Sequence, residues 1–152
     1  MSWFEQKYDL TNLDVYHAKA SAGAAFPSPI EANARCLGVL YISGEIIITG
    51  PNGNIPCGAV DTFTRWTAGS IDATCEVGPD GAEWFCFVCD NPQSKSTEQV
   101  SVNGSYTLPA QTQAIVVEGA LTAAGESYAP ISEMLFAEDM PISGNGTLIL
   151  VR

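Results

Sequence analysis

The sequence predicts an all-β fold, a single sandwich or barrel built from short strands. Charged residues make up only 15% of the chain, well below the roughly 25% of typical globular proteins. In contrast, 14 glycines and 9 prolines supply many turn formers. From residue 36 onward, short apolar or alternating runs are separated by turn residues, a spacing typical of sandwiches and barrels. No window of a dozen residues carries the apolar stripe of an amphipathic helix.

The first 34 residues differ from the rest of the chain. Their segment AKASAGAAFPSPIEANA is rich in small residues and has neither a helical nor an alternating period. We therefore expect an irregular N-terminal arm over residues 1–34 and a β domain over residues 35–152. Five aromatic side chains in the arm would form a sticky surface if exposed, so we expect them to lie in contacts with other subunits: Trp3, Phe4, Tyr8, Tyr16 and Phe26.

Strand candidates in the β domain follow one another as CLGVLYI, EIIIT, AVDTFTRW, IDATCEV, EWFCFVC, QVSVNG, SYTLP, AIVVEG, EMLFAE and TLILVR. The segments between them hold residues that tolerate a positive φ or fix φ near the value that a turn needs. These predicted turns lie at residues 51–54, 79–81, 91–92, 103–104 and 144–146. Asn103-Gly104 is the strongest hairpin signal, because a type I′ turn favours that pair.

The five cysteines raise the question of a metal or redox site. Cys86 and Cys89 have a C-x-x-C spacing, but the residues between them are strand formers, and residues three apart in a strand point to opposite faces. A zinc knuckle needs its pair on a tight turn, and a redox pair lies at a helix start. We therefore expect Trp84, Cys86 and Val88 to share one strand face. We also expect no bound metal and five free thiols, those of Cys36, Cys57, Cys75, Cys86 and Cys89.

Charge and motif content exclude several classes of function. The formal net charge is −11, and the six basic residues form no run, so nucleic-acid phosphates or an anionic membrane would meet no basic patch. The single histidine, His17, lies in the arm, and no phosphate-binding glycine loop occurs. No segment reaches about 20 apolar residues, and the N-terminus lacks the pattern of a secretory signal. We expect a non-catalytic protein without a cofactor, made in the cytoplasm.

The C-terminal region resembles the closing half of a cupin-type jelly roll. In such domains a strand ends at a glycine, here Gly119, and a second glycine and a proline turn follow, here Gly125 and Pro130, before a last strand over residues 147–151. The resemblance implies a jelly roll of two Greek keys. Metal-binding cupins have a histidine where this chain has Leu135. A similar, unevenly spaced series occurs earlier in the chain, at Gly44, Gly53, Pro56 and Phe63.

A small acidic jelly roll with an aromatic arm and no catalytic set also looks like the accessory proteins of tailed-phage particles. This resemblance implies a structural or assembly role in a virion, as a capsid decoration or tail component. It further implies a homo-oligomer, with a trimer favoured, that contacts capsid or tail subunits. The alternative is a cupin-like protein that binds a small molecule or carbohydrate inside its barrel. Aromatic rings would then stack on the ligand, and the candidates are Trp66, Trp84, Tyr106 and Tyr128.

Overall fold

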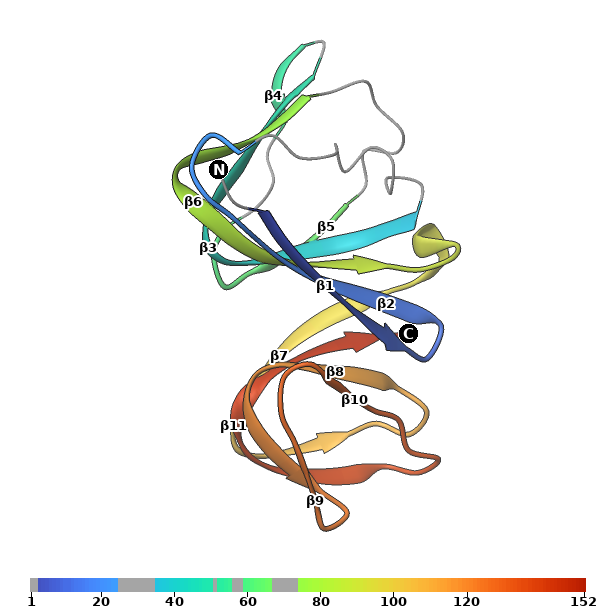
Figure 1. The fold of residues 1–152 in the computed structure, drawn as a ribbon. Coiled ribbons are helices and arrows are strands. Elements are labelled where there is room, and N and C mark those ends of the chain that lie inside the picture. The colour runs from blue at the N-terminus through green and yellow to red at the C-terminus, as the bar shows by residue number, and fades with distance from the viewer. Residues whose placement is uncertain (1–2, 25–34, 51, 56–58, 67–73) are drawn as a thin grey trace. The chain divides into compact units, whose positions relative to one another are not determined.

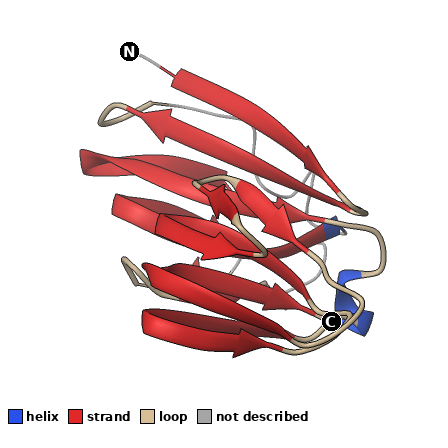
Figure 2. Ribbon diagram, turned by 90° about the horizontal axis from the view of Figure 1, so that it is seen from below, coloured by secondary structure: helices blue, strands red, loops and turns tan. Residues whose placement is uncertain are grey.

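The computed structural model describes residues 3–24, 35–50, 52–55, 59–66 and 74–152. Most of these residues are β-strand, and the helical element η2 (Pro92–Ser94) is a single 3-10 turn (Figure 2). The chain divides into two compact units, Met1–Ser94 and Lys95–Arg152, each with its own antiparallel sheet. The predicted all-β class is therefore confirmed.

The sheet of the first unit has the strand order β1-β2-β6-β3-β4, and β5 pairs with β3 (Figure 1). Its described strands are β1 (Trp3–Leu10), β2 (Leu13–Ala20), β3 (Cys36–Gly50), β4 (Gly53–Ile55), β5 (Phe63–Arg65) and β6 (Thr74–Val88). One buried cluster on this sheet combines three aromatic side chains with small alanines of β2. We call it the aromatic cluster; it contains Ala18, Ala20, Ala24, Cys36, Tyr41, Ile46, Trp66, Val77, Ala82 and Trp84.

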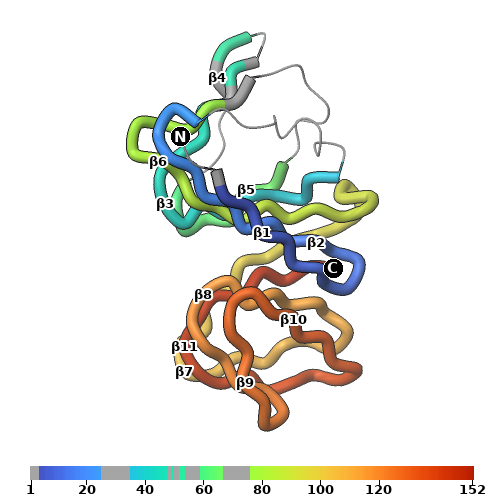
Figure 3. Tube along the Cα trace, in the orientation of Figure 1, coloured from blue at the N-terminus to red at the C-terminus, as the bar shows by residue number. Residues whose placement is uncertain are grey.

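The sheet of the second unit has the order β10-β8-β11-β7, and β9 pairs with β8. Its described strands are β7 (Thr97–Leu108), β8 (Gln113–Ala123), β9 (Glu126–Tyr128), β10 (Ser132–Met134) and β11 (Met140–Val151). Figure 3 traces the chain from β8 through β9 and β10 to β11, curling round the interior of the unit. That interior is the aliphatic cluster: Val102, Leu108, Ala114, Val116, Leu121, Ala123, Met134, Ile142, Leu148 and Leu150.

The expectation of an irregular arm is wrong for residues 3–20. β1 and β2 form an antiparallel hairpin, and β2 pairs with β6 along its length. Strand-forming propensity in β2 is low, because alanines and a lysine occupy its second half. Packing overrides it, since Ala18 lies directly opposite the large Trp84 and both side chains are buried. Residues 25–34, which include Phe26, lie outside the described residues.

Three of the predicted turns are instead bends within long strands. Asn103-Gly104 does not form a hairpin, because β7 continues through it and pairs with residues 144–145 of β11. The predicted turns at residues 144–146 and 79–81 likewise lie inside β11 and β6. Gly81, Gly104 and Gly144 all have positive φ. Glycine at positive φ can redirect a strand as well as end it, and here the partner strand bends at the same place.

The predicted strand through Cys86 is confirmed as β6 (Thr74–Val88), but burial does not alternate along it. Trp84, Phe85, Phe87 and Val88 are all buried, and only Cys86 is partly exposed in this stretch. β6 is an inner strand between β2 and β3, and side chains on both of its faces are buried. On the face opposite the aromatic cluster, the Phe63 ring meets Phe87 edge-on with centroids 5.1 Å apart.

The glycine series predicted from the sequence occurs in both sheets. Gly44 and Gly119 have φ of 68° and 82°, and a Cβ at either position would overlap a carbonyl oxygen of the paired strand. Gly53 and Gly125 follow them at positive φ, with open space where a side chain would lie. β3 and β8 therefore each bend at a glycine, and a larger residue there would clash with the paired strand. Pro56 lies outside the described residues.

Candidate functional site

An open pocket of about 290 Å³ lies within the second unit. Leu150, a buried member of the aliphatic cluster, contributes the apolar part of its lining. The other lining residues are polar or charged: Ser96, Thr97, Glu98 and Arg152. An apolar surface with a few polar groups around it is the usual composition of a small-molecule site, and the volume is near the lower end of the usual range.

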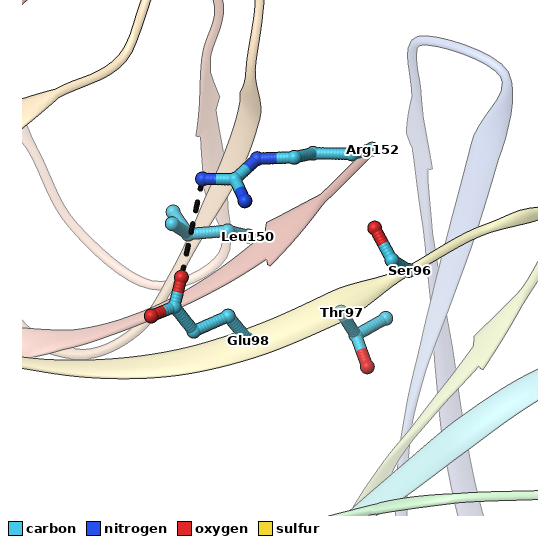
Figure 4. Close-up of a pocket in the computed structure, with 5 residues that line it drawn as sticks. All are labelled: Ser96, Thr97, Glu98, Leu150 and Arg152. Carbon is cyan, nitrogen blue, oxygen red and sulfur yellow. Dashed lines mark ion pairs between the residues drawn. The ribbon is translucent and has the colours of Figure 1, made fainter.

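Strand pairing brings together lining residues from the two ends of the second unit. Ser96 and Arg152 exchange two backbone hydrogen bonds, each 2.9 Å between nitrogen and oxygen, and Glu98 lies directly opposite Leu150. Directly opposed residues of antiparallel strands point to the same face. Figure 4 accordingly shows Glu98, Leu150 and Arg152 on one side of the strands, with Thr97 pointing away from them.

Glu98 and Arg152 form a loose ion pair across the pocket. The Arg152 Nη2 atom is 3.9 Å from Glu98 Oε2, and about half of each side chain is exposed (49% and 57%). Charge-assisted hydrogen bonds are typically about 2.7–2.9 Å long, so these two groups attract without a close hydrogen bond. Both can therefore bind a polar group that enters between them, the carboxylate by accepting and the guanidinium by donating hydrogen bonds.

Tyr106 adds an aromatic ring to the same electrostatic environment. Burial raises the pKa of its hydroxyl, the negative charge of Glu98 raises it further, and the positive charge of Arg152 lowers it. Tyr106 also packs against the aliphatic cluster. One of the four residues predicted to stack on a ligand thus lies within electrostatic reach of the charged pair.

The other three predicted stacking residues are placed elsewhere. Trp66 and Trp84 lie together in the aromatic cluster of the first unit, where only 9% and 5% of their surface is exposed. Tyr128 packs at the margin of the aliphatic cluster, and its hydroxyl donates a 3.5 Å hydrogen bond to Glu126. The structure therefore groups two of the candidates in one unit and two in the other.

Among the residues predicted for the interface, Phe4 is the most exposed of those whose side chains are described. It is 48% exposed, whereas Tyr8 and Tyr16 are half-buried. The side chain of Trp3 and the whole of Phe26 lie outside the described part. Because β1 ends the described order of its sheet, Phe4 lies on an edge strand.

His17 lies in contact with side chains of β1 and β6, whereas a position in an irregular arm predicted no such contacts. Its Nε2 atom is 2.7 Å from Oε2 of Glu83. Its ring lies near those of Phe4 and Phe85, with centroid distances of 5.8 Å and 4.9 Å. Lys19, two residues after His17 in β2, lies directly opposite Glu83 in β6. The contact between His17 and Glu83 therefore depends on a strand pairing that an irregular arm would not have.

No set of three or more His, Cys, Asp and Glu side chains among the described residues is arranged to hold a metal ion. Nor do those residues include a helix with the length and apolar character of a membrane span. One site that the described side chains do offer is the polar pocket with its charged pair.

The two curled sheets and the repeated glycine series define an all-β protein with a cupin-like fold. Three solved structures share this fold over most of the chain. HutD from Pseudomonas fluorescens has a TM-score of 0.56 at 16% identity, covering 92% of this chain and 78% of its own. The Escherichia coli protein Ylba, described as DUF861, has a TM-score of 0.60 at 7% identity, with 98% and 81% covered. AerE from Microcystis aeruginosa has a TM-score of 0.55 at 12% identity, with 98% and 90% covered.

These likenesses establish the fold and agree with the predicted resemblance to cupins. None of them supports the expected role as a phage virion component. No protein-family model matches the sequence, and no curated protein matches it.

Proposed function

We propose that the protein is a cupin-like binding protein for a small, hydroxyl-rich molecule such as a sugar, and that it acts without catalysing a reaction. The observation that carries this proposal is the loose Glu98–Arg152 pair in a pocket that the buried Leu150 also lines. Sugars present hydroxyl groups that both donate and accept hydrogen bonds, together with apolar C–H faces. The pocket offers an acceptor, a donor and an apolar surface in one place.

Tyr106 supports the choice of a sugar over a purely charged ligand. An aromatic ring packs well against the C–H face of a sugar, and Tyr106 is partly buried against the aliphatic cluster. The volume of about 290 Å³ suits a ligand of one or two rings. The opposite charges of Glu98 and Arg152 leave the pocket without a strong preference for anions or cations.

Isothermal titration calorimetry with neutral hexoses, disaccharides and uronic acids tests this proposal. We expect at least one sugar to bind to the full chain, and Glu98→Gln and Arg152→Ala each to weaken its binding by at least about tenfold, because each removes a charged hydrogen bond worth about 1.5–3 kcal/mol. Glu118→Gln is the matched control, since Glu118 is an exposed glutamate of β8 that does not line the pocket.

Two results would contradict the proposal. If no sugar of the panel binds at millimolar concentration, the ligand class is wrong. If a sugar binds equally well to the Glu98 and Arg152 variants, the binding site lies elsewhere, and the aromatic cluster with Trp66 and Trp84 becomes the next region to test.

A further inference from the structure

Two cysteines that are 50 positions apart in the sequence meet in the first unit. The Sγ atom of Cys36, on β3, is 3.9 Å from the Sγ atom of Cys86, on β6. Both belong with the aromatic cluster, Cys36 as a buried member and Cys86 as a partly buried neighbour. The C-x-x-C partner of Cys86 does not occupy this position, because Cys89 lies beyond the end of β6.

We propose that Cys36 and Cys86 form a peroxide-reactive dithiol site, in which a hydroperoxide oxidises the two thiols to a reversible disulfide. The sulfur atoms need to approach from 3.9 Å to about 2 Å. The strand pairing can accommodate such a movement, because the register between β3 and β6 shifts between Cys36 and Gly38. A bulged position adjusts more easily than a regular ladder.

The surroundings of Cys36 favour the thiolate that such chemistry requires. The hydrogen bond from the Cys86 thiol is the main influence that lowers the pKa of Cys36, and the Gly38 backbone N–H and the Arg65 charge lower it further, against the opposing effect of burial. Arg65 is held in place by hydrogen bonds from its guanidinium to the carbonyl oxygens of Leu37 and Pro92, each 2.9 Å. The same contact with Cys36 raises the pKa of Cys86, so Cys86 keeps its proton. The pair thus provides a nucleophile and a second thiol beside it.

The reaction balances without any other reagent. The Cys36 thiolate attacks one oxygen of hydrogen peroxide, the O–O bond breaks, and Cys36 becomes a sulfenic acid while hydroxide leaves and takes a proton to form water. The Cys86 sulfur then attacks the sulfenic sulfur, and a second water leaves with the Cys86 proton. Two thiols are oxidised to one disulfide, and one peroxide is reduced to two waters. A peroxide is small enough to reach a buried thiol more readily than a bulky disulfide.

Mass spectrometry of the full chain tests the proposal with hydrogen peroxide as the probe. After brief treatment, we expect the intact mass to fall by two hydrogen atoms and dithiothreitol to restore it. Digestion without reductant should yield a Cys36–Cys86 cross-linked peptide. The variants Cys36→Ala and Cys86→Ala each lack one sulfur atom of the pair, so neither should show the loss of two hydrogen atoms. Cys89→Ala, which also removes a buried thiol, should behave like the parent chain.

A reversible Cys36–Cys86 disulfide after peroxide treatment would support the proposal. A cross-link between Cys86 and Cys89, a cross-link that involves Cys57 or Cys75, or oxidation of single thiols to sulfinic acid without a disulfide would each overturn the proposal. Circular dichroism of each alanine variant shows whether it is folded. The parent chain and Cys89→Ala give the answer even if one variant fails to fold. This site is in the first unit and does not depend on the proposed sugar pocket.

Discussion

Gly104 of β7 lies directly opposite Gly144 of β11, and both residues have a positive φ, 94° and 114°. The two strands therefore bend at the same point and remain paired on both sides of it. Their surroundings differ, because a Cβ at Gly104 would meet open space, whereas a Cβ at Gly144 would overlap the carbonyl oxygen of Ala120 in β8. One glycine is needed for its backbone conformation alone, the other also for the close approach of a neighbouring strand.

This difference predicts unequal effects of two alanine substitutions. Gly104→Ala should lower the free energy of unfolding by about 1–3 kcal/mol, the usual cost of a strained backbone conformation. Gly144→Ala should lower it further, because the overlap with Ala120 adds to the same strain. Urea denaturation of the two variants measures both values. Equal losses, or a larger loss for Gly104→Ala, would show that the close approach between β11 and β8 is not the cause.

The two charges of the pocket should shift the titration of Tyr106 in opposite directions. Because Glu98 raises the pKa of Tyr106 and Arg152 lowers it, Glu98→Gln should lower that pKa and Arg152→Ala should raise it. The absorbance of tyrosinate during alkaline titration measures the effect, after subtraction of the titration of a Tyr106→Phe variant. Glu118→Gln should change nothing. Shifts of the same sign in both variants would mean that the charges of Glu98 and Arg152 do not act directly on the Tyr106 hydroxyl.

The raised pKa of Tyr106 also fixes the sign of its contribution to stability. A folded-state pKa above the unfolded value means that the contribution is fully present below the unfolded value, about 10, and is lost as the pH rises through the folded value. Glu98→Gln should bring the folded value closer to the unfolded one, so this variant should lose less stability than the parent chain as the pH rises through this range. Thermal unfolding across the alkaline range measures the two losses.

The fold class could be predicted from the sequence, but the ends of several strands could not. Low charge, abundant glycine and short apolar runs indicated an all-β chain, and Gly119 and Gly125 indicated a cupin-like closing half. Asn103-Gly104 misled the prediction, because the same positive φ serves a hairpin turn and a bend inside a strand. Only the partner strand distinguishes the two, and here residues 144–145 of β11 continue the pairing.

The candidate site was less predictable because it depends on strand register. Glu98 and Arg152 are far apart in the sequence, and neither lies in a recognisable motif. They meet because β7 and β11 pair without a shift over their whole length, and a change of register by one residue would send one of them to the opposite face. Residue type alone predicts Tyr106 as a candidate for stacking on a ligand. It does not predict that the charges of Glu98 and Arg152 act on Tyr106.

The N-terminal hairpin changes what a truncation should do. β2 lies between β1 and β6, so it is an inner strand of its sheet. Val15 is fully buried, and Ala18 is nearly so. β1, in contrast, ends the described strand order and carries the exposed Phe4. An edge strand leaves one row of N–H and C=O groups unpaired, which makes it a natural place for a second chain to pair.

We therefore predict that removal of residues 1–10 and removal of residues 1–30 have different outcomes. The shorter deletion removes only the edge strand, so the chain should keep the circular dichroism of a β protein. The longer deletion removes β2 with Val15 and Ala18, and it should prevent cooperative folding, because a buried strand face would be lost.

Light scattering should find the intact chain as a homo-oligomer, with a trimer favoured, and the chain without residues 1–10 should associate more weakly. Phe4→Ser is the milder control for the exposed ring. A monomeric intact chain, or a folded chain after the longer deletion, would contradict this account of the N-terminal hairpin.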